Sequence, residues 1–126
     1  MGETERYQRG KSTRIKVLGA AHVEKAIKAA DEFGEVFQQL STEVCWGEIW
    51  TRPELDMKTR SLCTIAILAA NGQDAEVKVH TKGALNNGAT REEIREVLLH
   101  VAVYAGFPAA NEAFRAVREA LTEYSA

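Results

Sequence analysis

Residues 46–80, WGEIWTRPELDMKTRSLCTIAILAANGQDAEVKVH, decide the fold. From Leu62 to Ala70, eight of nine residues are apolar and only Thr64 interrupts the run. A helix with almost no polar face is expected to be buried on all sides. Asp56 can cap the start of such a helix, and Asn71-Gly72 is a stop signal after it. The stretch therefore predicts a central, buried helix over residues 57–70.

Candidate chemistry lies on both sides of this helix. Glu76 and His80 are four residues apart, a spacing that places both side chains on one face of the following helix. His80 is a possible general acid or base, and the Glu76 carboxylate would favour its imidazolium form. Arg60 can hold a substrate carboxylate, because a guanidinium binds carboxylates through two parallel hydrogen bonds. The alternatives are an ordinary surface histidine with a solvent-exposed Glu76, and a salt bridge at the helix start for Arg60.

Two indoles flank a carboxylate just before the buried run. If Trp46 and Trp50 form apolar walls around Glu48, that carboxyl group is a second candidate acid. The alternative is that the indoles belong to the core and Glu48 points to water. Cys63 is expected to be a small core residue, and Cys45 a thiol near the indoles.

The composition limits the function classes. A chain of 126 residues with 16 basic and 18 acidic side chains predicts one domain over 1–126, without a basic block for nucleic acid or an anionic membrane. The sequence has no Cys/His spacing that suits zinc and no apolar run long enough to span a bilayer. With a polar N-terminal segment as well, we expect a cytoplasmic protein.

Helical periodicity covers almost the whole chain and predicts an all-α fold of six or seven helices. Thr90 and Glu93 form a capping box before a stripe of apolar residues that ends near Ala105. The expected helices span 4–18, 20–30, 31 to about 46, 57–70, 74–86, 90–105 and 108 to about 124.

Four motifs carry a resemblance to a known family. They are WGEIWTRP, LDMKTRSL, the H…GALNNG block and LLHVAVYAGFPAAN, in that order along the chain. The sequence resembles the carboxymuconolactone decarboxylase family, within the alkyl hydroperoxidase D-like superfamily, and is most similar to its members that act on 4-carboxymuconolactone. The resemblance implies a compact helical fold, a homo-oligomer that is commonly a hexamer, and a site near a subunit interface.

The implied reaction is a decarboxylation in the β-ketoadipate route of aromatic catabolism. The substrate would be an unsaturated five-membered lactone that carries a carboxylate and an acetate arm, and the products would be β-ketoadipate enol-lactone and carbon dioxide. The lactone carbonyl accepts the electron pair that carbon dioxide leaves behind, so no pyridoxal phosphate, thiamine or metal is required.

The resemblance also implies roles for particular residues. Arg60 would hold a substrate carboxylate, and His80, supported by Glu76, would donate to the oxyanion or protonate carbon. Glu48 is the alternative acid between the walls formed by Trp46 and Trp50. Asn86 and Tyr104 are weaker candidates for contacts with the oxyanion.

Two other functions remain open from the sequence. One is a thiol-dependent antioxidant enzyme of the same superfamily, whose two cysteines would correspond to Gln73 and Glu76 in this chain. Without thiols there, this function requires Cys45 and Cys63 to act together. The other is a non-enzymatic, oligomeric binding protein. For assembly, we expect Leu99, Val103 or Phe114 to be buried between subunits.

Overall fold

The computed structural model describes residues 3–125 and confirms the all-α fold class. Within these residues the chain forms seven α-helices and one π-helix, and it divides after Leu55 into two units. Whether residues 1–126 form the single domain expected from the sequence stays a prediction.

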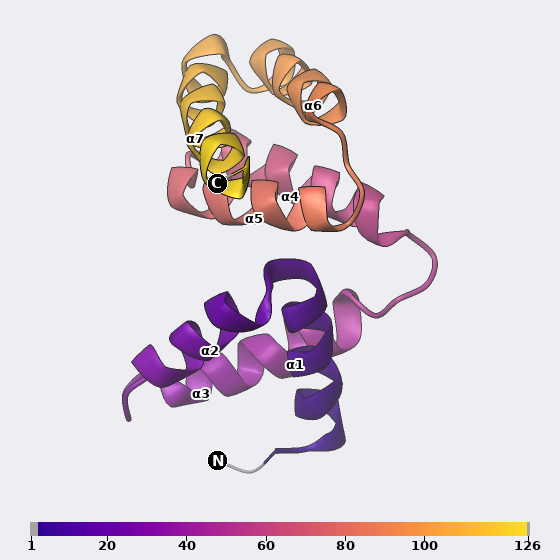
Figure 1. The fold of residues 1–126 in the computed structure, drawn as a ribbon, viewed down its shortest axis with the longest axis vertical. Helices are drawn as coiled ribbons and strands as arrows, with labels where there is room; N and C mark the ends of the chain where they lie inside the picture. Colours follow the sequence, from indigo (N-terminus) through magenta and orange to yellow (C-terminus); the bar gives the residue numbers. More distant parts are fainter. Residues whose placement is uncertain (1–2, 126) are drawn as a thin grey trace. The chain divides into compact units, whose positions relative to one another are not determined.

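The first unit consists of short helices that are joined by tight connections (Figure 1). They are α1 (Glu5–Leu18), α2 (Ala20–Ala29), α3 (Glu35–Leu40) and the π-helix η1 (Ser41–Ile49). The Thr4 hydroxyl accepts a hydrogen bond from the Tyr7 N–H at 3.0 Å and caps α1. Val17 and Val23 are fully buried in this unit. The indoles of Trp46 and Trp50 are almost fully buried.

The contact between α1 and η1 is made by backbone. A Cβ at Gly10 would lie 1.9 Å from the Thr42 carbonyl oxygen, and one at Gly47 would lie 2.6 Å from the Arg6 carbonyl oxygen. Only glycine permits such an approach. The predicted single helix from residue 31 to about 46 is therefore wrong in detail: the turn at 32–34 and the wider π-helical turns of η1 replace it.

The second unit contains α4 (Met57–Ala70), α5 (Asp74–Asn86), α6 (Arg91–Tyr104) and α7 (Phe107–Ser125) (Figure 1). Helix α4 contacts each of the other three. The core includes fully buried side chains from all four helices, among them Ile65, Val77, Leu98 and Ala113. These helices occur where the sequence predicted them.

The helix ends follow the sequence signals. The Asp56 carboxylate accepts from the Thr59 N–H at 2.7 Å, and Gly72 adopts a φ of 70° after α4. Thr90 and Glu93 form both hydrogen bonds of the predicted capping box, at 3.0 and 2.9 Å. Lys58 Nζ lies 3.0 Å from the same Glu93 carboxylate, so a salt bridge connects the start of α4 to the start of α6.

The prediction that α4 is buried on all sides is wrong for the single chain. Only Ser61, Ile65 and Ala69 are buried, while 61% of Ile67 is exposed. Cys63 is also exposed rather than a core residue. The physical reason is that α5, α6 and α7 cover one side of α4, whereas its apolar composition extends around the whole circumference.

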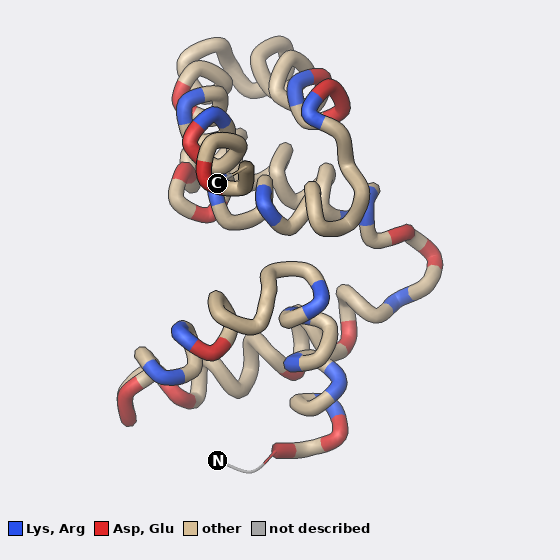
Figure 2. Tube along the Cα trace, in the orientation of Figure 1, with Lys and Arg blue, Asp and Glu red and all other residues tan. Residues whose placement is uncertain are grey.

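The distribution of charged and apolar residues over residues 3–125 agrees with what the composition predicts. Acidic and basic residues both occur in each of the two units (Figure 2). No helix within residues 3–125 has the length and apolar character that crossing a membrane requires.

The backbone contact between α1 and η1 generates a prediction about stability. We expect Gly10→Ala to lower the free energy of unfolding by about 2 kcal/mol or more, because the new methyl group overlaps a backbone carbonyl that cannot move alone. Gly34→Ala is the matched control, since its Cβ would meet its nearest neighbour at an ordinary 3.4 Å. Urea denaturation measures both, and equal stability of the two variants would contradict the account.

The capping box generates a prediction about pH. Hydrogen bonds from the Thr90 N–H and Lys58 hold the pKa of Glu93 below its ordinary value of 4.5. A carboxylate with a lowered folded-state pKa contributes stability that is complete above its unfolded-state pKa and is lost as the pH falls through its folded-state pKa. We expect Glu93→Gln to lower Tm at pH 7 and to flatten the fall of Tm below about pH 4.5. Glu92→Gln, in the same helical turn, is the control. If Tm fell equally steeply at acid pH in wild type and in Glu93→Gln, the contribution of Glu93 to stability would be excluded.

Candidate functional site

The candidate histidine lies on the buried face of α5. Val77, His80, Thr81 and Ala84 are buried in that helix at the three- and four-residue spacing of one face. His80 is only 8% exposed, so the alternative of an ordinary surface histidine is wrong. The imidazole is the one ionisable side chain among the buried residues of this helix.

Glu76 and His80 come together as the sequence predicted. His80 Nε2 lies 3.9 Å from Glu76 Oε2, one helical turn away. The histidine side chain is 10% exposed and the carboxylate 57% exposed. The pair thus places a solvent-exposed carboxylate beside a buried imidazole, at a distance beyond that of a hydrogen bond.

Arg60 and Asn86 also lie in the second unit. Arg60 is half-buried in the first turns of α4, and its carbonyl accepts from the Thr64 hydroxyl at 2.8 Å. Asn86 is the last residue of α5, where its side-chain oxygen accepts a hydrogen bond from the Tyr124 hydroxyl at 2.8 Å. This bond orients the amide, and it joins residues 38 apart in the sequence, a contact that helical spacing does not reveal.

Tyr104 lies at a different place in the second unit. Its ring contacts that of His100, with centroids 4.9 Å apart, and both line a pocket of about 590 Å³ between α4 and α6. Apolar side chains dominate the lining, and Glu96 is its single charged residue. No Lys or Arg lines this pocket, so it offers no permanent positive charge to a substrate with two carboxylates, and His80 is not part of its lining.

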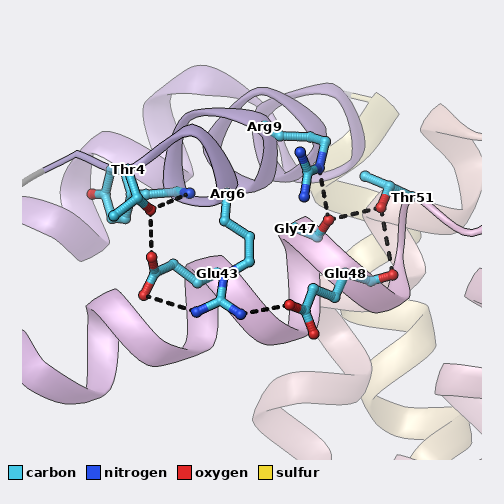
Figure 3. A network of polar contacts seen from close by, with 8 residues as sticks. Thr4, Arg6, Arg9, Glu43, Gly47, Glu48 and Thr51 are labelled. Carbon is cyan, nitrogen blue, oxygen red and sulfur yellow. Dashed lines mark hydrogen bonds and ion pairs between the residues drawn. The ribbon is translucent and has the colours of Figure 1, made fainter.

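The first unit holds the two indoles and the second candidate acid. Trp46 and Trp50 stack on each other with ring centroids 4.7 Å apart, rather than enclosing a carboxylate. The Glu48 side chain is 44% exposed, and its Oε1 accepts from Arg6 Nη1 at 2.5 Å (Figure 3). In this unit, then, the structure agrees with the alternative in which the indoles are core and Glu48 points outward.

Arg6 joins two carboxylates of η1 that sequence reasoning did not connect. Besides Glu48, it approaches the Glu43 carboxylate at 3.8 Å, which also accepts a hydrogen bond from the Thr4 hydroxyl (Figure 3). The bond to Glu48 raises the pKa of Arg6 above its ordinary value. Arg6 is 37 or more residues from both partners in sequence, and the only sequence sign of the contact is the motif around Gly47.

The two thiols are free and occupy different units. Burial raises the pKa of Cys45 above its ordinary value of 9.0, although the Arg14 charge and a hydrogen bond with Trp50 act in the opposite direction. A raised pKa disfavours the thiolate and hence nucleophilic chemistry at Cys45. Among residues 3–125, no three His, Cys, Asp or Glu side chains group as a metal site would require.

Known proteins with similar sequences agree on one family. The model of the carboxymuconolactone decarboxylase family matches residues 35–119. The chain is 40% identical over 119 residues to a 4-carboxymuconolactone decarboxylase of Acinetobacter baylyi, an alignment that covers 94% of this chain and 89% of the relative. It is 41% identical over 117 residues to a nitrosuccinic acid decarboxylase of Metarhizium robertsii, with 93% and 82% covered. This chain therefore belongs to the carboxymuconolactone decarboxylase family.

Proposed function

We propose that this decarboxylase converts 4-carboxymuconolactone to β-ketoadipate enol-lactone and carbon dioxide without a cofactor. The observation that carries the proposal is the 40% identity over 94% of the chain to a decarboxylase of that name. The buried His80 with its partner Glu76 supplies the proton chemistry that the reaction needs.

The electron balance explains why a positioned proton donor is the main requirement. The bond between the carboxylate and the ring carbon breaks, and its electron pair moves through the ring double bond to the lactone carbonyl oxygen. The resulting oxyanion returns the pair when the carbon next to the carbonyl takes a proton. The protein must therefore stabilise a negative charge and deliver one proton.

The second relative supports the same principle. Nitrosuccinic acid carries a nitro group, which accepts an electron pair as the lactone carbonyl does. Both named substrates thus contain their own electron acceptor. A protein that holds the carboxylate and supplies a proton serves either reaction, whereas the shape of the pocket selects the substrate.

The proposed roles follow the chemistry of each side chain. Arg60 binds a substrate carboxylate, and His80 donates to the oxyanion or protonates carbon while Glu76 supports its charged form. Asn86, oriented by Tyr124, is a further donor to the oxyanion. These assignments rest on residue type, burial and the contacts within the second unit.

The remaining candidates are weaker. Glu48 already accepts a hydrogen bond from Arg6, and Tyr104 lines a pocket that His80 does not line. The role of Trp46 and Trp50 as walls that exclude water from the departing carboxylate stays a prediction, and so does the cytoplasmic location expected from the sequence.

The direct test of the proposal follows carbon dioxide release from 4-carboxymuconolactone with purified protein, and from nitrosuccinate in a parallel reaction. We expect turnover of the lactone to exceed turnover of nitrosuccinate. Turnover of nitrosuccinate alone would overturn the substrate assignment and leave the chain a decarboxylase of another acid.

A prediction for His80 follows from its proposed role. We expect His80→Gln to fold normally and to lose about a hundredfold or more in kcat, as when one donor to an oxyanion is removed. Lys82→Gln in the same helix is the control, because Lys82 pairs with Glu123 and has no proposed role. Turnover within a few-fold of wild type in a folded His80→Gln protein would remove His80 from the mechanism.

We also propose that the enzyme is a homo-oligomer, with a hexamer as the expected state. Leu99 and Val103 are exposed, the latter by 70%, and exposed apolar patches of this kind usually mark interfaces. Phe114 is the weakest of the three candidates for an interface, because it already packs against the core of its own unit. Light scattering at micromolar concentration is expected to give several times the 13.9 kDa of one chain. A stable mass near 13.9 kDa would exclude assembly.

A further inference from the structure

The second unit has a groove between α6 and α7 that the proposed mechanism does not use. Leu98, Phe114, Val117 and Leu121 form an apolar surface in a cavity of about 360 Å³. An adjoining cavity of about 430 Å³ shares Leu121 with it and extends to the end of α7. None of the candidate catalytic residues lines either cavity.

Arginines distinguish this groove from the larger pocket between α4 and α6. Arg91 and Arg118 line both cavities, and Arg95 lines the first. Glu92 is the single carboxylate among these lining residues and Arg95 is paired with Glu96, so Arg91 and Arg118 supply the remaining positive charge of the groove. An anion is therefore favoured here and disfavoured in the larger pocket, whose single charged residue is Glu96.

Two of these guanidinium groups have no acidic partner among residues 3–125. Arg95 pairs with Glu96 at 3.4 Å, and Arg115, further along α7, pairs with Glu112 at 2.9 Å. In contrast, the guanidinium groups of Arg91 and Arg118 form no salt bridge and no hydrogen bond with residues 3–125. The Arg118 guanidinium carbon lies 5.8 Å from the centroid of the Phe114 ring, which holds this charge over the apolar surface.

These observations define the chemistry of an occupant. Guanidinium groups bind carboxylates through paired hydrogen bonds, and two of them at one groove suit two carboxylates. The apolar surface in the same cavity suits a short hydrocarbon chain. We propose that the α6–α7 groove is a binding site for a small aliphatic dicarboxylate, separate from the candidate catalytic residues. The proposal does not depend on the identity of the decarboxylated substrate.

The test uses adipate as the probe and isothermal titration calorimetry with the full-length protein. We expect saturable binding that Arg91→Gln and Arg118→Gln each weaken by about fivefold or more, as expected for losing a charge-assisted hydrogen bond. Arg115→Gln is the matched control, because it makes the same charge change on α7 outside the groove, and it is expected to leave the affinity unchanged. Equal weakening by all three variants would show general charge attraction and overturn the proposal.

Three further measurements locate the site. Hexane-1,6-diol, which has the same hydrocarbon chain without charge, is expected not to compete with adipate. Arg60→Gln is expected to retain adipate affinity. If Arg60→Gln lost this affinity while Arg91→Gln retained it, binding would be assigned to the candidate catalytic site instead. Light scattering is expected to give the same mass for Arg91→Gln and wild type, and dissociation of the variant would identify the groove as a subunit interface and overturn the proposal.

Discussion

Burial of one narrow face of α4 is the constraint on which the second unit depends. Ile65 and Ala69, one turn apart, are fully buried where α4 contacts α5, α6 and α7. Interiors are packed as closely as organic crystals, so this contact fixes the rotation of α4 about its axis. This rotation leaves the other apolar face, with Ile67, open, and Arg60 lies in the first turn of the same helix. A single helix thus supplies the core, a candidate substrate contact and an exposed apolar surface.

The site combines burial and solvent access in a way that suits proton delivery. His80 shares the buried face of α5 with Val77 and Ala84, where few water molecules compete for its protons. Glu76, one turn earlier, keeps most of its carboxylate in water. In the proposed reaction the electron acceptor is part of the substrate, so the protein would have no cofactor chemistry to provide, and positioning of charge and proton would be its main contribution.

The sequence predicted local structure well and the environment of side chains less well. Asp56 and the Thr90–Glu93 box were identifiable because caps depend on neighbours within four residues. The exposure of Cys63 was not identifiable from the sequence, because an apolar run does not indicate how many faces of its helix pack against other helices. The contact of Gly10 with η1 also lay beyond sequence reasoning, since its two sides are more than 30 residues apart. Pairing by helical spacing found Glu76 and His80, but it could not find contacts between distant segments.

Turnover in D₂O tests the central claim most directly, namely that the lactone accepts the electron pair and the protein delivers the proton. The account predicts that early product carries one deuteron, on the ring carbon next to the carbonyl, in a single configuration, because a fixed donor reaches one face of the ring. An equal mixture of the two configurations at that carbon, measured by NMR before exchange with solvent, would contradict it. So would product whose deuterium lies at the carbon that lost carbon dioxide.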